Sequence, residues 1–108
     1  MEIRPSIAED FVKFFGKVPK MTVRSLTGVD DAGEVLAIGG YYLYGGAAIA
    51  FTDHRKGISK RDMVKGAREL MKMLKETNLN VIATSDDDKA VALKHYGFEQ
   101  AGKAWRMM

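Results

Sequence analysis

A strand, a helix and a second strand follow one another in the second half of the chain. Residues 47–52 are almost wholly apolar, residues 59–76 carry apolar side chains at helical spacing, and residues 81–84 form another short apolar run. A helix that joins two neighbouring strands of one sheet leaves those strands parallel. The sequence therefore predicts a sheet with a parallel pair and a helix packed against it.

The first half of the chain predicts strands, one helix and tight turns. Residues 1–6, 21–29 and 34–44 have strand patterns, and Asp30–Gly33 has turn chemistry. Apolar residues recur at helical spacing from Ile7 to Phe15, and Ser6 with Glu9 forms an expected capping box. Gly45-Gly46 is a hairpin signal, and Gly39-Gly40 marks a bulge or a close backbone approach. The three strands between residues 21 and 52 should form an antiparallel meander.

The remaining residues complete the expected fold. Asp86-Asp87-Asp88 should start a helix over residues 89–96, and residues 98–108 should supply one or two strands. The expected order is β-α-β-β-β-α-β-α-β, an α+β fold with a mixed central sheet and helices on both faces. Since no linker or repeat interrupts the 108 residues, we expect a single domain over residues 1–108.

Composition excludes several classes of protein. The chain has no cysteine, which excludes disulfides and thiolate metal sites and fits a cytoplasmic protein. No apolar run is long enough to span a membrane, and the N-terminal residues lack a signal-peptide pattern. The three consecutive aspartates are expected to interact with a helix start and not to bind a metal ion. We therefore expect no metal and no membrane partner.

Positive charge is concentrated in one segment. Residues 54–75 contain eight Lys/Arg and two acidic residues, whereas the whole chain carries a net charge of +3. The segment starts with the loop DHRKGISKRD, in which Gly57 precedes the start of the expected helix. Unpaired amides at a helix start, together with a glycine and basic side chains, suit a bound phosphate. A solvated turn with ordinary surface lysines explains these residues equally well, and neither P-loop nor GxGxxG spacing is present.

The ordered combination of these features resembles the GNAT superfamily of acyl-CoA-dependent N-acyltransferases. In that family a loop Arg/Gln-x-x-Gly-x-Gly/Ala follows a strand and opens a helix. Here Gly57 matches the first glycine and Ser59 the small residue, whereas His54 stands where Arg or Gln is usual. The strand segment VLAIGG and the ending KHYGFEQAG are also similar to the family, so the resemblance covers nearly the whole chain in order.

The resemblance implies acetyl-CoA or another acyl-CoA as co-substrate. Backbone groups around Ile49 and Phe51 would meet the pantetheine, the loop would hold the pyrophosphate, and Asp86 would face the cofactor at a position where the family often has Asn. The cofactor-binding residues that the resemblance implies are Ile49, Phe51, Arg55, Lys56, Gly57, Ile58, Ser59, Lys60 and Asp86.

The catalytic residues are not defined by this resemblance. Family members commonly place a Tyr acid on the last helix, four residues before the Gly-Phe glycine, where this chain has Leu93. Tyr96 is a weak candidate because it lies about one helical turn away. Asp53, His54 and His95 are conceivable bases, although a surface role is favoured for each of them.

Three hypotheses about function therefore stand together. The first is an N-acyltransferase that acts on an unidentified amine, and a homodimer could cover an exposed sheet edge. The second is a catalytically inactive GNAT-like structural or interaction protein, since short phage-encoded GNAT-like proteins look similar. The third is nucleic-acid binding through the basic segment, which is disfavoured because interleaved exposed aromatics and a recognised motif are absent.

Overall fold

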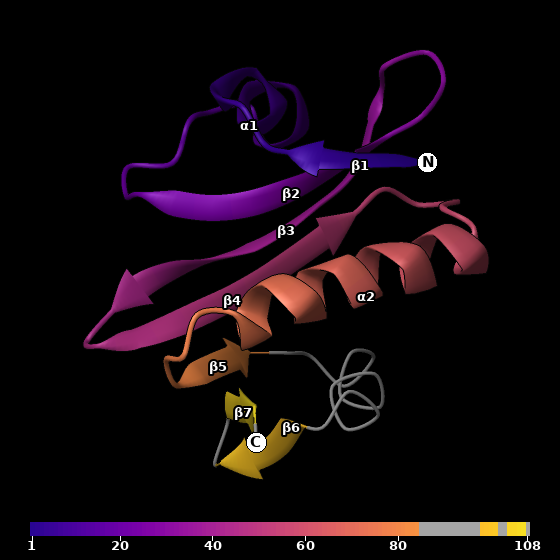
Figure 1. Cartoon of the computed structure of the whole chain (residues 1–108). Coiled ribbons are helices and arrows are strands. Elements are labelled where there is room, and N and C mark those ends of the chain that lie inside the picture. The colour runs from indigo at the N-terminus through magenta and orange to yellow at the C-terminus, as the bar shows by residue number, and fades with distance from the viewer. Residues whose placement is uncertain (85–97, 102–103, 108) are drawn as a thin grey trace.

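The computed structural model describes residues 1–84, 98–101 and 104–107. In this part of the chain the elements are β1 (Glu2–Pro5), α1 (Ala8–Phe15), β2 (Val23–Val29), β3 (Val35–Tyr44), β4 (Ala47–His54), α2 (Lys60–Lys75), β5 (Val81–Thr84), β6 (Phe98–Ala101) and β7 (Ala104–Met107). They form a mixed α+β fold with one sheet and two helices (Figure 1). The α+β class is thus as the sequence predicts.

The strands lie in the order β1-β2-β3-β4-β5-β7-β6. Strands β1 to β4 are antiparallel neighbours, which confirms the predicted meander. Gly45 and Gly46 form the tight turn between β3 and β4, and both have positive φ angles of 60° and 81°. Only glycine adopts such angles in succession without steric cost, so this hairpin follows directly from the sequence.

Strand β5 is parallel to β4, as the strand–helix–strand order predicts. The two strands pair through three register positions, from Ala48↔Val81 to Ala50↔Ala83. Strand β7 then pairs antiparallel with β5, and β6 pairs with β7. One or two strands were predicted for residues 98–108, and the structure has two, β6 and β7, which pair antiparallel. The helix expected over residues 89–96 lies outside the described residues.

Gly39-Gly40 marks a close backbone approach and not a bulge. The β2–β3 register runs regularly through both glycines and shifts instead between Gly28 and Val29. A Cβ atom on Gly40 would collide with the carbonyl oxygen of Arg24, and one on Gly39 would press on Leu70 of α2 at 3.1 Å. The glycines therefore let the neighbouring strand and α2 lie close to β3.

Two hydrophobic clusters hold the helices to the sheet. Helix α2 contributes Met71 and Leu74 to one cluster, together with Tyr41, Ala48, Ala50, Val81 and Ala83. Helix α1 contributes Phe11 to the other, together with Val29, Val35 and Ile38. Among the apolar residues at helical spacing in α2, Met71 and Leu74 are buried, whereas Met63 in the first turn is 44% exposed. The three tyrosines of β3 differ in exposure, from buried Tyr41 to exposed Tyr44.

The start of α1 differs from the predicted capping box. Ile7 occupies the N-cap position, and the carboxylate of Asp10, not that of Glu9, accepts a hydrogen bond from the Ile7 amide at 2.8 Å. The Ser6 hydroxyl is engaged with Thr27 Oγ1 at 2.6 Å. The prediction was wrong by one residue because contacts with β1 and β2 select Asp10. Gly16 ends the helix in the left-handed conformation, as its sequence position predicts.

Candidate anion-binding site at the start of α2

The basic loop leaves β4 at His54 and enters α2 at Lys60. Ser59 is the N-cap of α2, and its hydroxyl accepts a hydrogen bond from the Asp62 amide at 3.1 Å. Gly57 has a positive φ of 86°, and a Cβ added to it would find open space on every side within 4 Å. Gly57 is therefore required by backbone conformation and not by packing.

Backbone amides without acceptors gather along this loop. Among the described residues, none of the six consecutive amides from Lys56 to Arg61 donates a hydrogen bond to the protein. The first paired amide is that of Asp62, and the next is that of Met63, which donates to the Ser59 carbonyl at 3.0 Å. Since the loop is largely exposed, these donors can reach a ligand. Donors of this kind at the positive end of a helix bind anions.

Basic side chains add charge to the same region. Lys56, Lys60 and Arg61 are exposed. Lys60 and Arg61 line a shallow, open hollow together with Val64, Lys65, Arg68 and Glu69. The loop and the first turns of α2 therefore combine free amides with exposed cations, a donor set that suits a diphosphate.

Arg55 is directed elsewhere. Its Nε donates to the Val35 carbonyl at 2.8 Å, a terminal nitrogen donates to the Lys13 carbonyl at 3.4 Å, and its guanidinium lies 5.0 Å from the centre of the Phe14 ring. These contacts join the end of β4 to β3 and α1. Arg55 was predicted to bind the cofactor, but its side chain is committed to the fold in this structure.

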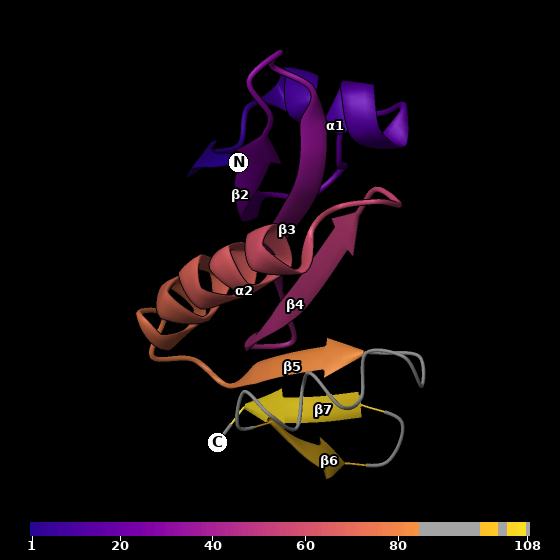
Figure 2. The same cartoon turned by 90° about the vertical axis from the view of Figure 1, so that its right-hand side faces the viewer.

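Strands β4 and β5 start side by side and then diverge (Figure 2). The Ala48 amide donates to the Asn80 carbonyl at 2.8 Å, so the backbone groups of Ala48 and Ala50 point toward β5. The backbone N–H and C=O groups of Ile49 and Phe51 then point toward β3, because these groups point to opposite neighbouring strands in successive residues. Phe51 lies beyond the last β4–β5 pair, and its side chain packs against the α1 cluster. The predicted pantetheine contacts at Ile49 and Phe51 would therefore need backbone groups that face β3.

The remaining candidate residues make few contacts or lie outside the described residues. Asp53 accepts a hydrogen bond from the His54 amide at 2.8 Å, and His54 Nδ1 lies 3.1 Å from the Arg55 carbonyl oxygen. Both side chains are exposed at the end of β4. Asp86, Leu93, His95 and Tyr96 lie outside the described residues. Among the residues that are described, no cluster of three or more potential metal ligands is found.

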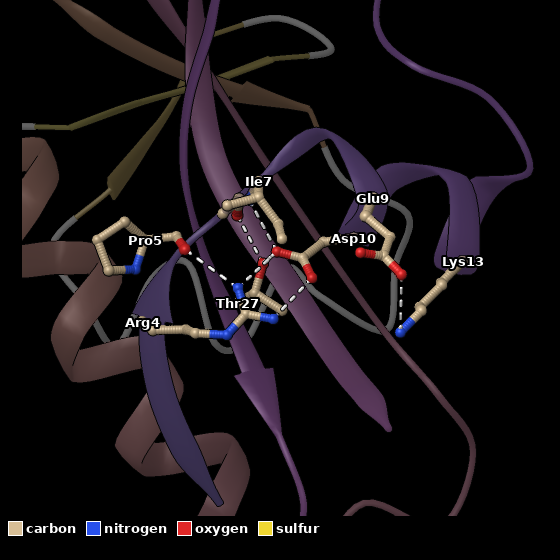
Figure 3. A network of polar contacts seen from close by, with 8 residues as sticks. Arg4, Pro5, Ile7, Glu9, Asp10, Lys13 and Thr27 are labelled. Carbon is tan, nitrogen blue, oxygen red and sulfur yellow. Dashed lines mark hydrogen bonds and ion pairs between the residues drawn. The ribbon is translucent and has the colours of Figure 1, made fainter. Parts of the chain in front are cut away.

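A buried polar network elsewhere was missed by sequence reasoning (Figure 3). Asp10 is 2% exposed, and Arg4 binds its two carboxylate oxygens at 2.7 and 2.8 Å. Thr27 Oγ1 also donates to Asp10, at 3.1 Å. The hydrogen bonds from Arg4 lower the pKa of Asp10 to about 2 despite its burial, and those from Ile7 and Thr27 act in the same direction.

This network is structural. The donors that face the carboxylate come from β1, from β2 and from the residue that caps α1, so the network ties these three elements together. The only signal in the sequence was the pairing of Arg4 with an acid six residues later, a spacing that no local rule singles out.

A scan against protein-family models finds no matching family, and searches of curated proteins and of solved structures find no match either. No helix in the described part of the chain is both long and apolar enough to cross a membrane.

Proposed function

We propose that this chain is a GNAT-like protein that binds an acyl-CoA through the loop between β4 and α2 and transfers the acyl group to an amine. The observation that carries the proposal is the run of six unpaired amides from Lys56 to Arg61 at the start of a basic helix. A CoA pyrophosphate offers the oxygens that these amides lack. Gly57 keeps the loop open, and Lys56 and Lys60 supply charge.

The fold supports the same proposal. Ile38 of β3 packs in the α1 cluster, whereas Tyr41 packs in the α2 cluster. Residues three apart in a strand face opposite sides, so we propose that the helices cover both faces of the sheet, and Figure 2 shows α1 and α2 on different sides of β3. Strand β4 also runs on to His54, beyond its last pair with β5, and leads directly into the loop.

The reaction would need an amine that attacks the thioester carbonyl and loses a proton, and a thiolate that leaves and gains one. The proposal assigns the binding half of this chemistry to the loop from Lys56 to Arg61. The catalytic acid remains assigned only by sequence, to the weak candidate Tyr96.

Calorimetric titration with acetyl-CoA and with desulfo-CoA tests the binding site. We expect binding in the micromolar range, and we expect Gly57→Glu to abolish it by placing a carboxylate among the amides. Gly33→Glu is a matched control. Gly33 also has positive φ, at 81°, with open space around it, but it lies in the turn between β2 and β3. Both variants therefore carry the same backbone strain and the same added charge.

No heat of binding at millimolar acetyl-CoA would contradict the proposal, as would equal loss of binding in the two variants. A thioester-consumption assay across a panel of amines then separates the two GNAT-like hypotheses. Turnover would establish a transferase, whereas CoA binding without turnover would favour the inactive protein that Leu93 suggests.

A further inference from the structure

Helix α2 carries a straight line of cations along its outer face. The five residues are spaced four, three, four and three apart, and they are Arg61, Lys65, Arg68, Lys72 and Lys75. At 3.6 residues per turn, this spacing confines them to an arc of about 80°, and they extend along about 21 Å of helix. We call these five residues the basic line.

All five side chains are exposed, and little of their charge is neutralised. Helix α2 has six Lys/Arg and two acids, a net charge of +4. Of the acids, Asp62 lies 3.6 Å from the α-amino group of Met1, and no ion pair of Glu69 is found among the described residues. Lys65 donates to the Met1 carbonyl at 2.7 Å, which leaves its charge in place.

The acyl-CoA proposal does not account for this line. The loop amides end at Arg61, whereas Arg68, Lys72 and Lys75 lie about 12 to 22 Å further along the helix axis than Lys60. One pyrophosphate at the loop cannot reach those three cations. A ligand that satisfies the whole line must present several negative charges in a row.

The residues around the basic line indicate which kind of polyanion it suits: a membrane surface, a single-stranded nucleic acid or a duplex. A helix that lies on a membrane needs a free apolar face, but the apolar face of α2 is packed into the core through Leu70, Met71 and Leu74. Single-stranded nucleic acid is held by stacking on aromatic side chains, and α2 has none. A rigid row of cations instead fits the phosphate backbone of a duplex, which needs neither feature.

We infer that the basic line of α2 binds the phosphate backbone of double-stranded DNA without reading its sequence. This inference is independent of acyl-CoA binding. The lack of interleaved exposed aromatics in the basic segment disfavours single-stranded nucleic acid, whose bases stack on such side chains. It does not bear on contacts with duplex phosphates.

Fluorescence anisotropy with a labelled DNA duplex of about 24 base pairs tests the inference. Five phosphate contacts predict a log–log salt slope of about −4.5, so the wild-type affinity should fall roughly 500-fold between about 50 and 200 mM salt. The triple variant Arg68→Gln/Lys72→Gln/Lys75→Gln should bind more weakly, and its slope should be about −1.8, a fall of only roughly 12-fold.

The matched control is Lys17→Gln/Lys20→Gln/Arg24→Gln. It removes the same charge from exposed cations on the α1–β2 connection and β2, and it should keep the wild-type slope. Glu69→Lys should tighten binding, since it adds a cation beside the line. The double variant Lys72→Gln/Lys75→Gln, whose residues do not line the hollow beside the loop, should weaken duplex binding and leave the acetyl-CoA titration unchanged, so the failure of one proposal does not imply failure of the other.

The inference is overturned if both triple variants lose the same affinity, which would show a net-charge effect. It is also overturned if no duplex binding is seen at about 50 mM salt. Binding that is tighter to single-stranded DNA, or to vesicles with anionic headgroups, than to the duplex would likewise overturn it, when the ligands are compared at the same total concentration of negative charge.

Discussion

The two helices begin in opposite ways. At the start of α1, the chain supplies its own anion, because the Asp10 carboxylate accepts the Ile7 amide and is held by Arg4 and Thr27. At the start of α2, the acidic residue of the first turn, Asp62, lies instead 3.6 Å from the α-amino group of Met1. Both helix starts present the positive end of a helix, but α1 is capped by a carboxylate of the chain, whereas α2 is capped by the neutral Ser59 hydroxyl.

This difference separates a structural site from a candidate binding site. Asp10 and Thr27 are buried and already hydrogen-bonded to each other, so loss of one partner would leave a buried polar group unpaired. The amides from Lys56 to Arg61 are exposed and unpaired among the described residues, so contacts with an external anion would be new. Mutations should therefore have different effects at the two sites. At the Asp10 network they should lower the free energy of unfolding, and at the loop before α2 they should weaken ligand binding.

The largest effect is expected when the Asp10 network is broken. Asp10→Ala removes the acceptor from the Arg4 guanidinium, the Thr27 hydroxyl and the Ile7 amide. We expect a loss of about 3 kcal/mol in the free energy of unfolding, near the lower limit for a broken buried pair, because Arg4 is partly exposed. Urea denaturation measures it.

Glu9→Ala is the control for this prediction. Glu9 is also in the first turn of α1, and its pair with Lys13, at 3.3 Å, is exposed on both sides. Its loss should cost less than about 0.5 kcal/mol. Equal destabilisation by the two substitutions would mean that the Asp10 network contributes nothing beyond a first-turn charge.

A smaller effect should appear as pH falls. The pKa of Asp10 is about 2 in the folded protein, against an ordinary value of 3.8, so the folded state binds this proton less readily than the unfolded state does. The stabilisation from Asp10 is complete above pH 4 to 5 and is lost as the pH falls toward 2. It amounts to about 2 kcal/mol.

The difference between wild type and Asp10→Asn isolates this contribution from that of the other carboxylates. We expect the two curves of unfolding free energy against pH to approach each other between pH 5 and pH 2. Curves that remain parallel over that range would show that the ionised form of Asp10 is not what stabilises α1.

The contrast between the helix starts also explains what sequence reasoning could reach. Local rules predicted the Gly45-Gly46 hairpin, and they also account for the Ser59 cap of α2 and for Gly16 at the end of α1, because each depends on one or two neighbouring residues. The same rules chose Ser6 and Glu9 at the start of α1. They failed there because the outcome depends on Arg4 and Thr27, which reach Asp10 from two different strands.

The candidate site shows the same limit. Gly57 and the start of α2 were predicted from spacing. The structure adds the unpaired amides, which make this loop a candidate anion-binding site. The contacts of Arg55 could not be predicted from spacing, since its position in the loop says nothing of the carbonyls of Lys13 and Val35, to which its guanidinium donates. Long-range acceptors for an arginine become visible only once the strands are paired.

The smallest change in stability should accompany a large change in binding. Ser59→Asp keeps a good N-cap, so the free energy of unfolding should change by less than about 0.5 kcal/mol. It also gives α2 what α1 already has, a carboxylate of its own at the helix start. That charge should repel a pyrophosphate and weaken acetyl-CoA binding roughly tenfold, a cost of about 1.4 kcal/mol. Ser59→Asn, an equally good cap without the charge, should bind as the wild type does. If the two variants bind acetyl-CoA equally well in a calorimetric titration, the anion does not lie at the start of α2, and the openness of that helix end has no role in ligand binding.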